Sequence, residues 1–204
     1  MIVKICGITR AEDARAAVEA GASAIGFIFW PGSPRYIDPY RARDIVRQLP
    51  PFVTAVGVFV DQPRDHVSGV ASLARLGALQ LHGKETPAAA ATLCRPVLKG
   101  ITLEDPVDTW PESVLLLLDA HDPVQHGGTG RAINWERAAR VAARRRVILA
   151  GGLTPDNVGD ALARVRPYGI DVSSGVEESP GIKHHGRIRA LFEALHAQHL
   201  SPRS

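Results

Sequence analysis

The chain has 204 residues, of which 45% are hydrophobic and 22% charged, with a formal net charge of +3. A chain of this length and composition can bury a full core as one globular domain, which we place at residues 1–204. Its two cysteines exclude a disulfide framework and indicate a cytoplasmic location. No apolar run is long enough to cross a bilayer, and the scattered basic residues favour a small anionic ligand over nucleic acid.

Short apolar segments alternate with amphipathic ones along the whole chain. The segments predicted as strands are 2–6, 24–28, 55–60, 78–81, 97–101, 114–119, 147–150 and 169–172. The segments predicted as helices are 11–19, 40–49, 64–76, 87–93, 135–145, 156–164 and 186–198, and 103–112 is predicted as a short or irregular helix. Several strands are apolar nearly throughout, which is typical of parallel strands buried on both faces.

Residues at the ends of the amphipathic segments support the predicted helices. A cap residue stands directly before a proline at Asp38, Thr86 and Thr154. This arrangement favours a first helical turn. Thr9 and Glu12 have the spacing of a capping box. Gly21 and Gly77 are predicted to end helices in the left-handed conformation.

Eight successive strand–helix units predict an α/β fold, a single (β/α)8 TIM barrel with its active site at the carboxyl ends of the strands. A doubly wound open sheet is the rival, but it would show a glycine-rich phosphate turn after the first strand. The first turn here, residues 7–10, reads Gly-Ile-Thr-Arg and lacks that pattern. Residues 199–204 are predicted to form a frayed tail.

Two glycine-rich loops, after the seventh and eighth predicted strands, indicate an anion site. The first contains Gly151 and Gly152, and the second contains Ser173, Ser174 and Gly175. Barrels commonly bind phosphate with these two loops, because glycines let backbone N–H groups approach the oxygens. A short helix after Gly175 would add its dipole. Ordinary turns are the alternative, and the absence of a nucleotide-binding motif favours a sugar phosphate as ligand.

Cys6 and Asp119, at the ends of the first and sixth predicted strands, are the candidate general base and general acid. Their alternatives are a small core residue and a turn residue, respectively. Arg35, after the second strand, is a candidate clamp for a carboxylate, and His82, after the fourth, a candidate lining residue. Both have the alternative of an ordinary loop residue. Residues 127–130, Gly-Gly-Thr-Gly, are a candidate cover over the site.

A metal site is not expected. The eight histidines are scattered. The adjacent pair His184 and His185 lacks the spacing of a helical zinc pair. A metal-dependent sugar-phosphate epimerase is therefore disfavoured.

Nine segments of the sequence together resemble phosphoribosylanthranilate isomerase. They occur in family order and cover nearly the whole chain, and they are specific jointly rather than singly. They are residues 4–9 (KICGIT), 26–29 (GFIF), 33–36 (SPRY), 57–60 (GVFV), 80–83 (QLHG), 118–119 (LD), 127–130 (GGTG), 149–153 (LAGGL) and 171–177 (DVSSGVE).

The resemblance implies a barrel of tryptophan biosynthesis that converts N-(5'-phosphoribosyl)anthranilate to 1-(2-carboxyphenylamino)-1-deoxyribulose 5-phosphate, an Amadori rearrangement without a cofactor. Cys6 matches the family's general base, Asp119 its general acid, and Arg35 the residue that holds the anthranilate carboxylate. The residues that match the phosphate-binding loops are Gly151, Gly152, Ser173, Ser174 and Gly175. His82 and Asp171 complete the predicted substrate-binding residues.

The sequence departs from the family pattern in two places. His184 stands where the family usually has an aspartate, at the predicted start of the last helix, and residues 121–126 are unusually polar. The oligomeric state, monomer or homodimer, is left open by the sequence.

Two other readings compete with the isomerase. Another phosphate-binding barrel is the first: an indole-glycerol-phosphate synthase would need a lysine acid at a strand end, where neither Lys4 nor Lys99 stands, and a histidine-pathway isomerase would have an aspartate in place of Cys6. A non-catalytic sugar-phosphate-binding protein is the second. The presence of both Cys6 and Asp119 argues against it.

Overall fold

Within the residues that the structure describes, 1–119 and 134–200, eight parallel strands pair in sequence order and close into a barrel. The strands of this computed structural model are β1 (Ile2–Ile5), β2 (Ala24–Ile28), β3 (Thr54–Phe59), β4 (Ala78–Leu81), β5 (Val97–Ile101), β6 (Leu115–Leu118), β7 (Val147–Leu149) and β8 (Gly169–Val172). The barrel closes because β1 pairs with both β2 and β8. The predicted (β/α)8 barrel is therefore confirmed, and the doubly wound sheet is wrong.

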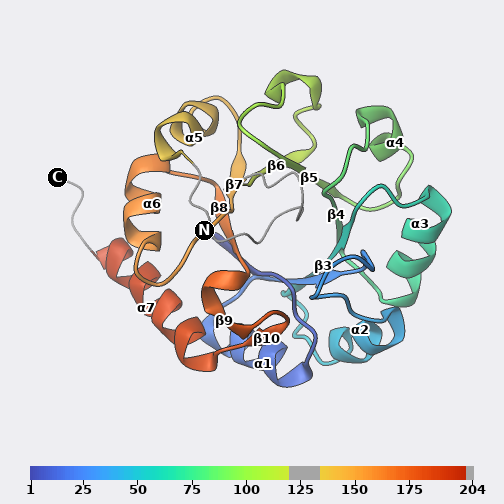
Figure 1. Cartoon of the computed structure of the whole chain (residues 1–204), viewed down its shortest axis with the longest axis horizontal. Coiled ribbons are helices and arrows are strands. Elements are labelled where there is room, and N and C mark those ends of the chain that lie inside the picture. The colour runs from blue at the N-terminus through green and yellow to red at the C-terminus, as the bar shows by residue number, and fades with distance from the viewer. Residues whose placement is uncertain (120–133, 201–204) are drawn as a thin grey trace.

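Helices surround the barrel as a ring, as Figure 1 shows in a view along its axis. They are α1 (Ala11–Ala20), α2 (Pro39–Val46), α3 (Arg64–Leu73), α4 (Pro87–Ala91), α5 (Trp135–Ala142), α6 (Val158–Val165) and α7 (His185–Leu200). The stretch 103–112, predicted as a short or irregular helix, contains one 3-10 turn, η1 (Val107–Thr109). None of the helices in the described part of the chain is long and apolar enough to span a membrane.

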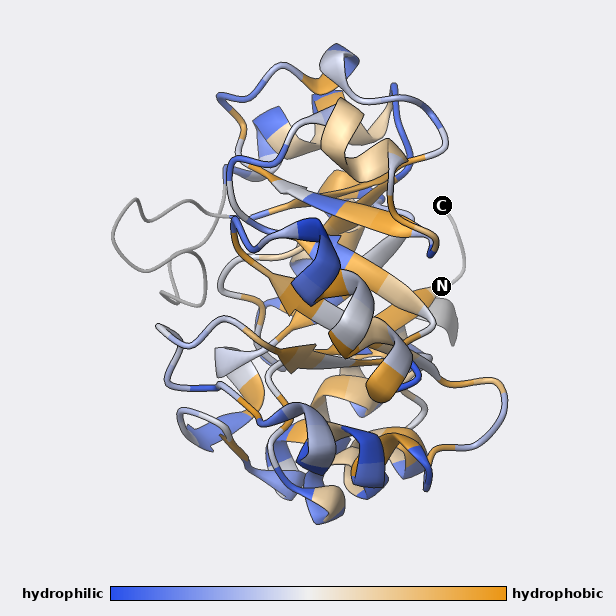
Figure 2. Cartoon of the chain, turned by 90° about the vertical axis from the view of Figure 1, so that its right-hand side faces the viewer, coloured by the Kyte–Doolittle hydropathy of each residue, from blue (hydrophilic) through white to orange (hydrophobic). Residues whose placement is uncertain are grey.

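The alternation of side chains along each strand separates two packed layers. Outward-facing residues such as Ile5, Phe27 and Leu116 are fully buried against the helices and belong to the largest apolar cluster. Inward-facing residues such as Ala24 and Val56 form a smaller cluster inside the barrel. In Figure 2 the strands are mostly hydrophobic, whereas the helices around them mix hydrophilic and hydrophobic residues. This packing fixes the strand ends and the residues that directly follow them.

Three of the predicted helix ends are confirmed. The Asp38 carboxylate accepts hydrogen bonds from the N–H groups of Tyr40 and Arg41 at the start of α2. The Thr86 hydroxyl accepts from the N–H of Ala89 at the start of α4. Gly21 ends α1 with a φ of +116°, a left-handed conformation that glycine adopts without steric cost.

Three other predicted ends are wrong. The Thr9 hydroxyl donates to the carbonyl of Gly181 and does not cap α1, so a contact distant in sequence replaces the capping box. Helix α6 begins at Val158 rather than after Thr154, because the Asn157 side chain accepts from the Thr154 N–H and holds the intervening turn. The left-handed residue after α3 is Arg75, not Gly77.

The chain after β8 forms a 3-10 turn and a two-stranded antiparallel sheet, neither of which was predicted from the sequence. A 3-10 turn, η2 (Ser174–Val176), takes the place of the helix expected after Gly175, and β9 (Glu177–Ser179) pairs antiparallel with β10 (Ile182–Lys183). His184 stands directly before α7 as expected, and its Nδ1 accepts from the N–H of Arg187. The candidate cover 127–130, the polar segment 121–126 and residues 201–204 of the predicted tail lie outside the described residues.

Candidate active site

Cys6 follows β1 directly, at the end of the barrel where the strands finish. It is buried, and its N–H donates to the carbonyl of Val172 at 2.9 Å. Gly26 on the neighbouring strand makes room for it, since a Cβ there would lie 2.7 Å from Cys6 Sγ and 3.0 Å from Lys4 Cε. Burial raises the pKa of the Cys6 thiol above its ordinary value, and the nearby Lys4 ammonium opposes part of that rise.

Lys4 lies inside the barrel, two residues before Cys6, with only 2% of its surface exposed. Its Nζ donates to Gln80 Oε1 at 2.8 Å and to Asp171 Oδ1 at 2.9 Å. Burial opposes its charge, but the carboxylate of Asp171 and the Cys6 side chain outweigh burial and raise the pKa of Lys4. The structure thus places Asp171, a predicted substrate-binding residue, against a charged lysine in the barrel interior.

Asp119 follows β6 directly, at the same end of the barrel as Cys6 but on a strand that does not pair with β1. Its N–H donates to the carbonyl of Ile101 at 3.0 Å, which continues the pairing with β5. Its Oδ2 lies 3.4 Å from Nε2 of His82, and 14% of each side chain is exposed. Two of the predicted site residues, His82 and Asp119, are therefore neighbours.

Arg35 does not project freely into solvent. Its Nε and Nη2 donate to both carboxylate oxygens of Glu177, at 2.7–3.1 Å, in the bidentate geometry of a strong ion pair. Lys183 Nζ also donates to Glu177, at 2.8 Å. Burial raises the pKa of Glu177, but Arg35 and Lys183 outweigh burial and lower it below its ordinary value. This pair engages Nε and Nη2, two of the three nitrogens of the guanidinium, and thereby fixes the side chain of Arg35.

The two glycine-rich loops contact each other at Gly175. A Cβ at this position would lie 1.8 Å from the carbonyl oxygen of Leu153, so the close approach of the two backbones requires glycine. In the first loop, Gly151 and Gly152 both have positive φ, +83° and +69°. In the second, the Ser173 hydroxyl donates to the carbonyl of Cys6 at 3.1 Å, which ties this loop to the base candidate.

We expect the substitution Gly175→Ala to push these two loops apart. Overpacking of this kind costs about 1–3 kcal/mol, which corresponds to a fall in Tm of roughly 2–12 °C for a chain of this size. Affinity for inorganic phosphate should fall with it, and both quantities can be measured by calorimetry. The matched control is Gly69→Ala, in α3, where a Cβ meets nothing within 4 Å. That change should stabilise the protein by about 0.5–1 kcal/mol. An unchanged Tm and phosphate affinity in Gly175→Ala would contradict the contact.

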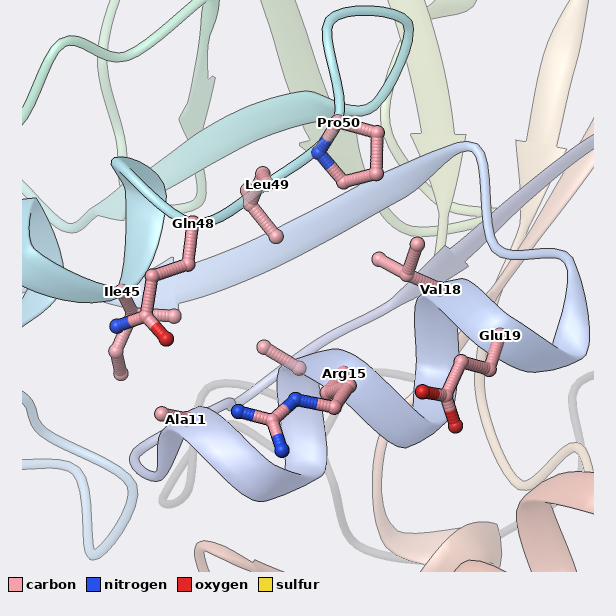
Figure 3. Close-up of a pocket in the computed structure, with 9 residues that line it drawn as sticks. Ala11, Arg15, Val18, Glu19, Ile45, Gln48, Leu49 and Pro50 are labelled. Atoms are coloured by element: carbon pink, nitrogen blue, oxygen red, sulfur yellow. The ribbon is translucent and has the colours of Figure 1, made fainter.

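The pocket in Figure 3 lies outside the barrel, between α1 and the end of α2. It measures about 200 Å³, and its lining includes Ala11, Arg15, Val18, Ile45, Gln48 and Leu49. None of the predicted site residues belongs to it.

Within residues 1–119 and 134–200, no three His, Cys, Asp or Glu side chains gather as metal ligands would. Independence from metal stays a prediction.

Sequence reasoning missed four residues that support the predicted ones. Glu177 binds Arg35, and Lys183 binds Glu177. Lys4 and Gln80 lie beneath Cys6 and His82. For the second pair a signal was present, since residues two positions before a strand-end residue face the same side of the strand. For the first pair the sequence offered none.

A closed parallel barrel with a thiol, a carboxylate and two glycine-rich loops at the carboxyl ends of its strands defines a (β/α)8-barrel enzyme. The sequence profile of one family, N-(5'-phosphoribosyl)anthranilate (PRA) isomerase, matches residues 3–194. The chain belongs to this family, and it is an isomerase.

Individual relatives agree with the family match. The N-(5'-phosphoribosyl)anthranilate isomerase of Pelobacter propionicus is 48% identical over 195 residues, 93% of either chain. The crystal structure of phosphoribosyl anthranilate isomerase from Thermus thermophilus has a TM-score of 0.88 and 46% identity, covering 97% of this chain and 99% of the other. A structure of such an isomerase in complex with reduced 1-(o-carboxyphenylamino)-1-deoxyribulose 5-phosphate has a TM-score of 0.84 and 40% identity, covering 97% of this chain and all of the other.

Proposed function

We propose that the chain converts N-(5'-phosphoribosyl)anthranilate to 1-(2-carboxyphenylamino)-1-deoxyribulose 5-phosphate in tryptophan biosynthesis, with Asp119 as general acid and Cys6 as general base. One observation supports this most strongly. Both residues directly follow barrel strands at the carboxyl end, in a chain whose family match spans residues 3–194. A relative of the same fold forms a complex with a reduced form of the proposed product.

The two residues would divide the proton transfers between them. Asp119 gives a proton to the furanose ring oxygen as the amine lone pair opens the ring to an iminium. The positive iminium then acidifies the proton on C2 of the sugar, and Cys6 removes it. The resulting enolamine tautomerises to the ketone. The iminium accepts the electron pair, so the chemistry requires no cofactor. Each proton transfer contributes roughly 10²–10⁴ in rate.

The remaining site residues would hold the two anionic ends of the substrate. Arg35, oriented by Glu177, offers Nη1 to the anthranilate carboxylate. The loops with Gly151 and Gly152 and with residues 173–175 offer backbone N–H groups and serine hydroxyls to the phosphate. Holding both ends places the reacting carbon between base and acid. His82 and Asp171 would line the wall between these ends. His82 contacts Gln80, and Asp171 contacts Lys4, which also contacts Gln80.

The lysine geometry favours the isomerase over an indole-glycerol-phosphate synthase. Lys4 is buried below the strand ends in an ion pair with Asp171. Lys99 Nζ lies 2.9 Å from Glu85 Oε2 and also donates to the carbonyl of Gly83. Both ammonium groups are thus held in ion pairs, and neither is placed to act as the acid that such a synthase needs.

The test is a fluorescence assay of purified protein with freshly made phosphoribosylanthranilate and a chelator. We expect loss of substrate fluorescence well above the rate of spontaneous hydrolysis, with carboxyphenylamino-deoxyribulose phosphate as the product. Protein that is folded by circular dichroism but does not turn over would reject the isomerase. Phosphate binding by such inactive protein would instead indicate a sugar-phosphate-binding barrel.

A further inference from the structure

A row of polar side chains runs through the barrel interior from Lys4, two residues before the base candidate Cys6, to the acid candidate Asp119. Lys4 Nζ lies 2.8 Å from Gln80 Oε1. Gln80 Nε2 lies 3.0 Å from His82 Nδ1, and His82 Nε2 lies 3.4 Å from Asp119 Oδ2. Lys4 lies on β1 and Gln80 on β4, two strands that do not pair, so the first of these contacts spans the barrel interior. Asp119 follows β6.

The donors and acceptors of these groups permit only one orientation of the Gln80 amide. A lysine ammonium has donors and no acceptor, so Gln80 must turn its carbonyl oxygen towards Lys4. Its amide NH2 group then faces His82 and donates to Nδ1. Because Nδ1 accepts, it carries no proton. The ring of a neutral His82 must therefore carry its proton on Nε2, the nitrogen that faces Asp119.

Packing prevents the row from rearranging. Lys4 and Gln80 are each 2% exposed, and Lys4 is held from a second side by Asp171 at 2.9 Å. Gly100 lies against the imidazole, since a Cβ there would come within 2.3 Å of His82 Nδ1. Of the described residues, Asp171 and Cys6 interact electrostatically with Lys4, and Asp119 faces His82. A flipped amide would set an N–H group of Gln80 against the ammonium of Lys4, which is unfavourable in a buried site.

We propose that Lys4 and Gln80 are positioning residues, which fix His82 as the Nε2–H tautomer so that it donates to Oδ2 of Asp119. This inference rests on the proposed role of Asp119 as general acid. With Oδ2 accepting from His82, the acid proton of Asp119 resides on Oδ1 and is available to the substrate. The opposite tautomer would present a lone pair to Oδ2 and draw the acid proton there, away from the ring oxygen.

The distance of 3.4 Å between His82 Nε2 and Asp119 Oδ2 fits a contact that shortens during the reaction. Catalytic hydrogen bonds are often long without substrate and tighten as charge develops. As Asp119 releases its proton, the carboxylate that forms is a stronger acceptor for the N–H of His82. A neutral donor stabilises this carboxylate without adding a positive charge next to the acid.

The substitution Gln80→Glu reverses the row without changing its size. Both oxygens of the new carboxylate are acceptors, so one accepts from Lys4 and the other requires a proton on His82 Nδ1. At pH 8, 15N-detected histidine spectra should show Nε2 protonated and Nδ1 unprotonated in the wild type. In Gln80→Glu, Nδ1 should be protonated. Loss of the resonances in His82→Asn assigns them.

Turnover should change together with the spectrum. We expect kcat of Gln80→Glu to fall about 10- to 100-fold, part of the roughly 10²–10⁴ that a positioned acid contributes, with KM nearly unchanged. A merely structural role for Gln80 would lower stability without moving the proton to Nδ1. Gln48→Glu, at an exposed position two residues after α2, adds the same charge outside the barrel. It should leave both the spectrum and kcat as in the wild type.

Two results would overturn the inference. One is a wild-type spectrum with the proton on Nδ1, and the other is a Gln80→Glu protein with the proton moved but kcat unchanged. Should Gln80→Glu fail to fold, Gln80→Met provides the same test, since it removes the donor to Nδ1 and should allow both tautomers. The tautomer is measured without substrate, so an inactive wild-type enzyme would reject the proposed function and leave the assignment of the His82 proton to stand or fall separately.

Discussion

Replacing Cys6 by serine is expected to lower kcat by roughly 10²–10⁴, with little change in KM. Serine has nearly the size of cysteine, so the close packing of Cys6 Sγ against Gly26 is preserved. Its hydroxyl does not ionise in the pH range of the enzyme and cannot accept the C2 proton. The fold should remain intact, which thermal unfolding can check. Turnover within threefold of the wild type would remove Cys6 from the mechanism.

The second cysteine supplies the control. Cys94 is exposed whereas Cys6 is buried, and Cys94→Ser should leave kcat unchanged.

Burial raises the pKa of Cys6, so a smaller fraction of Cys6 is thiolate at neutral pH than of an ordinary cysteine. Alkylation by iodoacetamide should therefore occur first at Cys94 and reach Cys6 only as the pH rises. Mass spectrometry of the modified peptides distinguishes the two, and faster labelling of Cys6 at pH 7 would contradict the raised pKa.

The strand-end residues could be located from the sequence because their signal is local. The apolar runs of β1 and β6 stop one residue before Cys6 and Asp119, and parallel topology places all such ends at one rim. The same reasoning located the loops with Gly152 and Gly175. Their close contact was not foreseeable, since it depends on how two backbones approach in the finished fold.

Pairings between distant residues were beyond the reach of sequence patterns. Arg35 and Glu177 are 142 positions apart, and Lys4 and Gln80 are 76 apart. Periodicity shows which face of a strand a residue occupies but not which side chain it meets there. The capping box predicted at Thr9 was wrong for the same reason, because the Thr9 hydroxyl bonds to the distant Gly181 and does not cap the helix. The role of Arg35 in anion binding stays a prediction, and the carboxylate of Glu177 that orients it was not predicted.

Replacing Asp119 by asparagine should also lower kcat by roughly 10²–10⁴. The amide keeps the size of the carboxylate and can still accept from His82, but it has no acid proton to give. Binding should survive, because phosphate and carboxylate recognition are assigned to other residues. Calorimetric titration with reduced 1-(o-carboxyphenylamino)-1-deoxyribulose 5-phosphate should give a Kd close to that of the wild type. A matched control is Asp108→Asn, whose carboxylate is 74% exposed and paired with Arg144 on the surface.

The double variant, Cys6→Ser with Asp119→Asn, tests whether the two residues act in one sequence of proton transfers. Groups that act as a unit show losses that do not multiply, because removing either one already abolishes the catalysed route. We therefore expect the double variant to be little slower than the slower single variant. Losses that multiply fully would mean that each residue accelerates a separate step. A kcat of Asp119→Asn near that of the wild type would exclude Asp119 as the acid, and with it the catalytic reason for the fixed proton on His82.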